Sequence, residues 1–204
     1  MAASVTTFES AARSFSGLVH RIPDDGWDGP GLGDWDLRAL VGHASRSLIT
    51  VSTYLQSPAE REDVATPQEY YAQIADYMSN AGAEAIAERG RQAGRDLGDD
   101  PARTVDELID RVLGQLATAR DPLIAVIGGL GIRLHTYLST RVFELAVHSL
   151  DIARATGLSL ELPAQVLDEA TVLAARIAVL TDRGGDVLMA LTGRTTLPTS
   201  FSVV

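Results

Sequence analysis

Apolar residues recur every three or four positions along most of the chain, which is the spacing of helices with one buried face. This spacing predicts helices over residues 7–21, 35–56, 66–93, 104–116, 138–156 and 163–177, and a short helical piece over 186–191. The segment LIAVIGGLGIRLHTYL instead carries β-branched runs around glycines, which indicate a short hairpin or an irregular crossover. The pattern as a whole predicts an all-α bundle of four long helices with short helical and extended additions at the C-terminus.

Capping residues mark the expected ends of these helices. Thr66 and Glu69 form a capping-box pattern around Pro67, a residue that suits the first turn of a helix. The other expected helix starts are marked by Thr6 with Glu9, by Asp34, and by Thr104 with Glu107. The stretch 94–101 interrupts the helical pattern, and Gly157 is suited to end the last of the long helices.

The stretch RVFELAVHSLDIARATG, residues 141–157, carries apolar residues nearly all the way round, which is typical of a helix in a core. Four polar residues nevertheless fall within one narrow sector of this helix: Arg141, Glu144, His148 and Asp151. An unpaired buried carboxylate is costly, so this polar line needs partners. Two interpretations are open: Glu144 and His148 hold a metal ion together, or they form a hydrogen-bonded pair that Arg141 satisfies.

A third ligand would favour the metal, and the chain has three histidines besides His148 that could supply it. His43 lies in the helix predicted over 35–56, roughly 120° from the centre of its apolar stripe, at the edge where a second helix can meet it. His20 suits the C-terminal end of a helix at the surface, and His135 favours a structural or surface role. Two histidines and one glutamate from facing helices leave an open position, as a catalytic ion requires.

Composition narrows the possible partners. The net charge is -10, and all 17 basic residues are arginine, so a basic face for nucleic acid is not expected. The N-terminus MAASVTTFES lacks the features of a signal peptide, and no apolar run approaches the ~20 residues of a membrane span. We therefore expect a soluble cytoplasmic protein with no membrane partner. The chain contains no cysteine, so thiol chemistry would need an external thiol.

Three motifs carry a resemblance to a known family. WDLRALVGH, RVFELAVHSLDIARATG and the C-terminal ALTGR resemble the mycothiol-dependent maleylpyruvate isomerase family, part of the DinB-like metal-binding superfamily. The resemblance runs from about residue 8 to the tail. It implies a DinB-like up-down-down-up four-helix bundle over residues 1–157, with C-terminal helices and a tail over 158–204 packed on it. The chain departs from the isomerase at this end, because the isomerase has a fuller second domain.

The resemblance also implies a metal site and a co-substrate. Carried over to matching positions, the metal ligands are His43, Glu144 and His148. The implied ion is divalent, with zinc as the first choice and nickel, iron or manganese as alternatives. The implied co-substrate is a low-molecular-weight thiol, which is mycothiol in actinobacteria.

Two further residues are candidates for the site. Asp151, one turn beyond His148, is expected either to orient the histidine or the thiol, or to form a salt bridge with Arg154 or Arg141. Arg194, in the sequence TGR, is a candidate for binding an anionic group of the thiol or the substrate, although an arginine after a glycine also suits a plain surface position.

The predicted chemistry is attack by a metal-stabilised thiolate on an electrophilic carbon. If addition to an alkene reverses after bond rotation, the outcome is cis–trans isomerisation, and if the adduct is kept, the outcome is S-transfer. Two alternatives are open: the same site activates water as a hydrolase, or it belongs to a non-catalytic sensor or interaction domain. The expected partners are a small-molecule electrophile and a low-molecular-weight thiol, with the protein a monomer or a homodimer.

Overall fold

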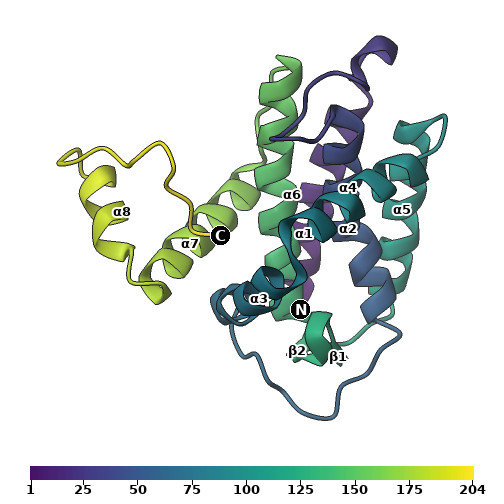
Figure 1. Cartoon of the computed structure of the whole chain (residues 1–204). Coiled ribbons are helices and arrows are strands. Elements are labelled where there is room, and N and C mark those ends of the chain that lie inside the picture. The colour runs from purple at the N-terminus through teal and green to yellow at the C-terminus, as the bar shows by residue number, and fades with distance from the viewer.

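The structure is a computed structural model of residues 1–204, and it describes every side chain except those of residues 76–81, 83 and 86. The fold is all-α with one small hairpin, as predicted (Figure 1). The helices are α1 (Ala2–Val19), α2 (Leu37–Tyr54), α3 (Pro67–Ala81), α4 (Ala83–Asp96), α5 (Pro101–Leu116), α6 (Leu134–Thr156), α7 (Ala164–Leu180) and α8 (Gly184–Leu191). The strands β1 (Leu123–Ala125) and β2 (Gly131–Arg133) pair antiparallel, which confirms the hairpin interpretation of this segment.

The main core lies between α1, α2, α5 and α6. Both α5 and α6 pack against α1 and against α2. The core is filled by large apolar side chains that recur at helical spacing, among them Phe8, Phe15, Leu40, Leu48, Val112, Leu138 and Leu145. Each such side chain contributes about 1.5–3 kcal/mol when fully buried. Helix α6 is apolar nearly all the way round because it also packs against α3 and α7. The up-down-down-up order of the bundle remains a prediction.

Several helices begin at a different residue than predicted, and for α2, which begins later, and α5, which begins earlier, the reason is that a different residue caps them. Asp36 caps α2 in place of Asp34, since its carboxylate accepts the backbone N–H of Ala39 at 2.7 Å. Asp100 likewise caps α5, so this helix starts before Thr104. Helices α1 and α6 also begin about one turn before the predicted residues. The capping box predicted at the start of α3 is confirmed.

The helix predicted over 66–93 is in fact two helices. Gly82 separates them with a φ of 79°, a conformation that residues with a side chain rarely adopt. Helix α4 then continues past Gly94, which was expected to interrupt it. A Cβ on Gly94 would lie 2.7 Å from the carbonyl oxygen of Arg38, so this glycine allows α4 to pack directly on α2. The helical pattern predicted over 66–93 includes apolar residues at Tyr77, Met78 and Ala81, whose side chains lie outside the described ones.

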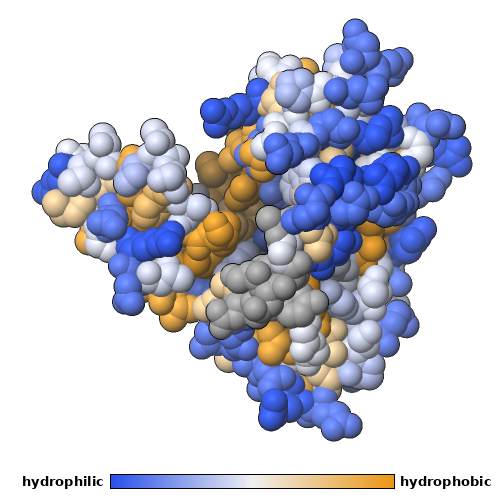
Figure 2. Space-filling model, in the orientation of Figure 1, coloured by the Kyte–Doolittle hydropathy of each residue, from blue (hydrophilic) through white to orange (hydrophobic). Residues whose placement is uncertain are grey.

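The C-terminal helices lie to one side of the bundle. Gly157 ends α6 in the left-handed conformation, as predicted. Helix α7 packs against α6, α3 and α1, whereas α8 contacts α7 and projects away from the bundle (Figure 1). Figure 2 shows apolar side chains gathered on the face that α7 presents, and those exposed on α7 and α8 include Val172, Val179, Leu180, Leu188 and Leu191. The division of the chain into a bundle over 1–157 and C-terminal helices with a tail over 158–204 packed on it remains a prediction. Across the described residues, every helix is too short or too polar to span a membrane.

Candidate metal centre

Packing of α2 against α6 brings together the three ligands that the sequence suggested. One side-chain ligand atom from each of His43, Glu144 and His148 lies within 4.8 Å of the other two. The rings of His43 and His148 meet edge to face, with their centroids 4.9 Å apart. All three residues are partly buried. The polar line of α6 and the histidine at the edge of α2 therefore converge on one point.

His43 has an unsatisfied nitrogen that suits a metal ligand. Its Nδ1 is buried and has no hydrogen-bond partner among the described residues. Burial, reinforced by the nearby His148, lowers the pKa of His43 to about 4, so the ring is neutral at pH 7. Trp35 lies against the ring at a centroid distance of 4.6 Å, and its indole N–H is anchored on the carbonyl of Ala87 in α4. A neutral, positioned imidazole with an unpaired nitrogen fits a divalent cation.

The carboxylate of Glu144 contacts one side chain of α3 and one side chain of its own helix, α6. The Tyr71 hydroxyl donates a hydrogen bond to Oε1 of Glu144 at 2.8 Å, while Oε2 lies 3.3 Å from Nε2 of His148. Burial alone would raise the pKa of Glu144, but the hydrogen bond from His148 and the charge of Arg141 together lower it to about 2. Glu144 is therefore an anion at neutral pH. The sequence pattern did not indicate Tyr71, because only tertiary contact brings α3 to this carboxylate.

Asp151 positions His148 within the same helix. Its Oδ2 lies 3.1 Å from Nδ1 of His148. Burial would lower the pKa of His148, but the hydrogen bonds to Asp151 and Glu144 raise it to about 9. The described side chains show this contact and no salt bridge from Asp151 to Arg154 or Arg141. A carboxylate on one ring nitrogen directs the other nitrogen toward a metal, which is the usual support of a histidine ligand.

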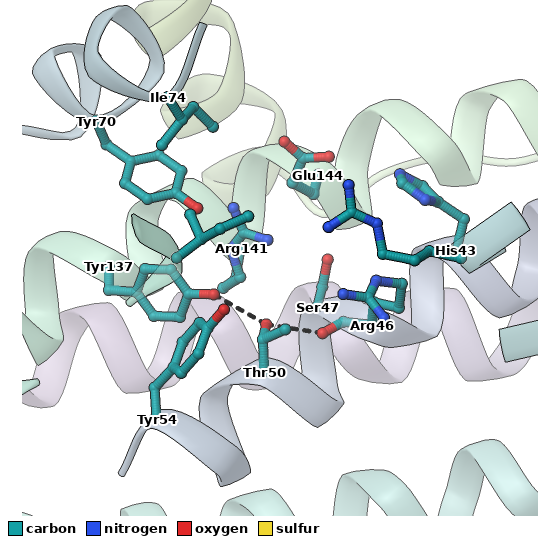
Figure 3. Close-up of a pocket in the computed structure, with 12 residues that line it drawn as sticks. His43, Arg46, Ser47, Thr50, Tyr54, Tyr70, Ile74, Tyr137, Arg141 and Glu144 are labelled. Atoms are coloured by element: carbon teal, nitrogen blue, oxygen red, sulfur yellow. Dashed lines mark hydrogen bonds between the residues drawn. The ribbon is translucent and has the colours of Figure 1, made fainter. Parts of the chain in front are cut away.

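A cavity of about 140 Å³ opens beside Glu144 and His43. Its polar lining includes Arg46, Tyr54, Tyr70, Arg89, Tyr137 and Arg141. Figure 3 shows the tyrosines at one end of this cavity and His43 and Glu144 at the other. The Tyr137 hydroxyl donates to the Thr50 hydroxyl at 2.9 Å, which fixes one wall. Two of the three candidate ligands, His43 and Glu144, thus line a space that a small molecule can enter. Besides these two, Arg141 is the lining residue that the sequence analysis singled out.

The other sequence candidates lie away from this cavity. His20 pairs with Asp106 through Nε2 at 2.8 Å, and His135 pairs with Asp121 through Nδ1 at 2.8 Å, both at the surface. Arg194 is exposed after α8, and its guanidinium donates to the backbone carbonyl two residues earlier. It is not among the described residues that line the cavity. The structure therefore does not bring Arg194 to the candidate centre.

Fold and site together define an all-α protein with a candidate metal centre of two histidines and one glutamate between two packed helices. The family model for the mycothiol maleylpyruvate isomerase N-terminal domain matches residues 8–153, a span that contains all three candidate ligands. The chain belongs to this family, as its motifs predicted. Searches of curated proteins and of solved structures found no match. Membership of the family suggests a mycothiol-related, metal-binding role.

Proposed function

We propose that this protein is a metal-dependent enzyme that uses a low-molecular-weight thiol, mycothiol, to attack a small electrophilic molecule. The observation that carries the proposal is the convergence of His43, Glu144 and His148 beside a cavity. Three protein ligands and an open position are what a catalytic ion needs. The chain has no cysteine, so an external thiol supplies the nucleophile that the protein lacks. Family membership supports mycothiol in this role.

Each residue of the centre has a distinct part. His43, Glu144 and His148 would hold the metal, which when bound favours the thiolate form of a thiol. Zinc suits two imidazoles and one carboxylate, with nickel, iron and manganese as alternatives. Asp151 keeps the Nδ1–H of His148 occupied, which leaves Nε2 for the metal. Tyr71 occupies one oxygen of Glu144 and leaves the other oxygen available.

The same residues serve two outcomes. The thiol gives its proton to solvent, and its sulfur adds to an electrophilic carbon. When the acceptor is an activated carbon–carbon double bond, rotation in the adduct and loss of the same thiolate give the geometric isomer. When the adduct instead keeps the sulfur and gains a proton, the product is a thioether. We propose a cytoplasmic, actinobacterial setting, since the cytosol keeps such thiols reduced.

The test uses the full chain loaded with zinc, with mycothiol and two probes: maleylpyruvate for isomerisation and monobromobimane for S-transfer. We expect turnover to require both metal and thiol. We also expect it to persist below pH ~8.5, the pKa region of a free thiol, because the metal favours the thiolate. His43→Ala should abolish turnover through loss of metal, and His135→Ala serves as the matched control on the surface.

Three results would contradict the proposal. Turnover by the metal-loaded protein without any thiol would favour metal-activated water and a hydrolase. Bound metal with no metal-dependent turnover of either probe would favour a sensor or an interaction domain. Equal rates in wild type and His43→Ala would place the chemistry outside this centre.

A further inference from the structure

The exposed large apolar side chains of this protein gather near its C-terminus. Within the described part of the chain, Leu32 is the only one that precedes α6. The others belong to α6, α7, α8 or the tail, namely Leu150, Leu167, Val172, Val179, Leu180, Leu188, Met189, Leu191, Leu197 and Val204. Single exposed apolar residues are ordinary on a protein surface, but a gathered set marks a surface that binds a partner.

One part of this surface is a groove along α7, with a volume of about 430 Å³. Its residues on α7 recur three or four positions apart and so share one face of the helix, as a packing face does. They are Val172, Ala175, Arg176, Val179 and Leu180, and Gln68 of α3 completes the lining. Arg176 is the one charged residue of this lining, and it forms no salt bridge among the described side chains.

The other part is α8, which projects from the end of α7 (Figure 1). This helix has 8 residues, and none of them is buried. Leu188 is 63% exposed and Leu191 is 74% exposed. Helices shorter than about 12–15 residues are marginal in water without packing, so α8 lacks the contacts that usually hold a helix of this length. Asp186 is the one charged residue of α8, and it too forms no salt bridge among the described side chains.

The turn between α7 and α8 fixes the direction in which α8 projects. Asp182 adopts a left-handed conformation there, with a φ of 59°. A Cβ on Gly184 would lie 2.7 Å from the side chain of Val179, so this glycine allows the close approach of the two helices. The guanidinium of Arg183 donates to the backbone carbonyl of Ser202, which ties the tail back to the turn. Helix α8 is therefore presented by a built turn.

The groove and α8 are complementary to each other. The groove is concave and apolar with one basic residue, whereas α8 is convex and apolar with one acidic residue. A projection and a matching recess on the same molecule allow two copies to exchange them across a two-fold axis. In such an exchange Asp186 of one copy is placed to meet Arg176 of the second copy.

The charge of this region favours a second copy over a lipid surface. The whole chain has a net charge of -10, whereas the side chains of residues 172–204 comprise three arginines and two aspartates, a net charge of +1. Two such surfaces approach without the repulsion that two acidic faces would have. A helix that lies on an anionic membrane carries several basic residues on its polar face, and α8 carries none.

The size of the surface suits a weak dimer. Each copy would cover six large apolar side chains that are now 39–74% exposed: Val172, Val179, Leu180, Leu188, Met189 and Leu191. Over both copies this removes roughly 500 Å² of apolar surface from water. Since apolar atoms make up about 60% of an interface, the total is on the order of 1,000 Å², the lower end for specific contacts.

We propose that this protein forms a two-fold symmetric dimer in which α8 of each copy binds in the α7 groove of the other copy. The dimer rests on the C-terminal helices alone and is independent of the candidate metal centre and of the proposed enzyme activity.

Sedimentation velocity of the full chain, from about 1 µM to about 500 µM, tests the dimer. We expect monomer at the low end and dimer at the high end, because the interface is small. Leu188→Asp and Leu191→Asp should each weaken the dimer at least about tenfold, since each places a charge in an apolar groove. Leu32→Asp is the matched control at an exposed leucine outside the interface, and it should leave the dimer unchanged.

Exchanging the two lone charges tests the pairing of α8 with the groove. Arg176→Asp and Asp186→Arg each place like charges opposite each other and should weaken the dimer about tenfold at low salt. The double variant restores opposite charges at the wild-type net charge, and it should dimerise within about twofold of wild type. Arg13→Asp on α1 changes the net charge as Arg176→Asp does and should have no effect.

Cross-linking between copies tests the exchange directly, because the chain has no cysteine of its own. Copies with Leu188→Cys are mixed with copies with Val172→Cys and treated with a short bismaleimide. We expect a mixed cross-linked dimer. Leu32→Cys in place of Val172→Cys should give only background.

Three results would overturn the inference. The first is a monomer at every concentration. The second is a dimer that Leu188→Asp, Leu191→Asp and both single charge changes leave intact, with helical circular dichroism like that of wild type, since such a dimer uses another surface. The third is a monomer that floats with vesicles of phosphatidylglycerol and phosphatidylcholine, because the apolar surface would then bind lipid.

Discussion

Two histidine–carboxylate pairs of this protein differ in their surroundings far more than in their geometry. His20 lies 2.8 Å from Asp106 where the end of α1 meets α5, and the two side chains are 49% and 45% exposed. His148 lies 3.1 Å from Asp151 between α2 and α6, with 13% of the histidine side chain exposed. Among the described contacts, the outer pair, His20 and Asp106, has no further carboxylate or histidine beside it. The inner pair, His148 and Asp151, has the carboxylate of Glu144 and the ring of His43 beside it.

The difference shows what turns an ion pair into a chemical site. A solvent-exposed pair is screened by water and contributes little, about 0–1 kcal/mol. A buried set of charges must be satisfied from within, and here a protonated His148 lies between Glu144 and Asp151. A divalent cation can take the place of the proton on Nε2, because Glu144 then has the cation as its positive partner and Asp151 keeps the Nδ1–H of His148. Only the inner pair should therefore respond to metal.

The sharpest test of the comparison is to remove the histidine from each pair. His148→Ala should reduce bound zinc to background after dialysis, because one of three protein ligands is lost. His20→Ala should retain the zinc content of wild type. Elemental analysis of the purified proteins measures both. Equal zinc in His148→Ala and wild type would mean that the metal lies elsewhere.

Zinc affinity should depend on pH through the inner pair. The pKa of His148 is raised to about 9, so below that pH the ring holds a proton that the metal must displace. Affinity should rise about tenfold per pH unit up to pH 9 and then level off. His43 and Glu144, with pKa values of about 4 and about 2, are already deprotonated above pH 6 and add no slope there. Competitive zinc titrations at pH 6.5, 7.5 and 8.5 measure the slope. A zinc affinity that does not change across this pH range would contradict the prediction.

Neutralising the carboxylate of each pair should have a smaller effect. Asp151→Asn should weaken zinc binding about 10–100-fold, since it removes the group that orients His148. Asp106→Asn is the matched change at the surface and should leave zinc affinity within error of wild type. Isothermal titration calorimetry measures the zinc affinity of both variants. A shared loss in both would show that net charge, and not the contact to His148, governs the affinity.

The smallest expected effect is on the stability of the metal-free fold. Glu144→Ala removes the hydrogen bond from Tyr71 and the ion pair with His148 but also removes a buried charge, so the free energy of unfolding should fall by less than about 3 kcal/mol. His148 keeps its contact to Asp151 and can become neutral. Urea unfolding at pH 7 measures the change, with Glu9→Ala on the surface of α1 as the control. A loss well beyond 3 kcal/mol would indicate that Glu144 serves a structural ion pair.

Much of the candidate site could be predicted because it lies on one helix. The spacing of Glu144, His148 and Asp151 places them on one face of any α-helix, whatever surrounds it. His43 was found from its position at the edge of the apolar stripe of α2. The fold class followed from the same periodicity, and helix starts were missed where Asp36 and Asp100 supplied caps that the pattern did not single out.

The rest of the site depends on contacts between residues far apart in the chain. Tyr71 reaches Glu144 only because α3 lies across α6, and Arg89 reaches the cavity only because α4 packs on α2. In the sequence, Gly94 suggested the end of a helix, whereas the structure uses it for close contact between two helices.

The sequence by itself determined what helical geometry imposes within one segment: the face shared by Glu144, His148 and Asp151, and the lack of a cysteine nucleophile. Only the tertiary structure decided which side chains from other helices complete the centre, and which arginines line its cavity. The physical reason is that backbone geometry sets spacing along a helix, whereas the approach of two helices depends on all the side chains packed between them.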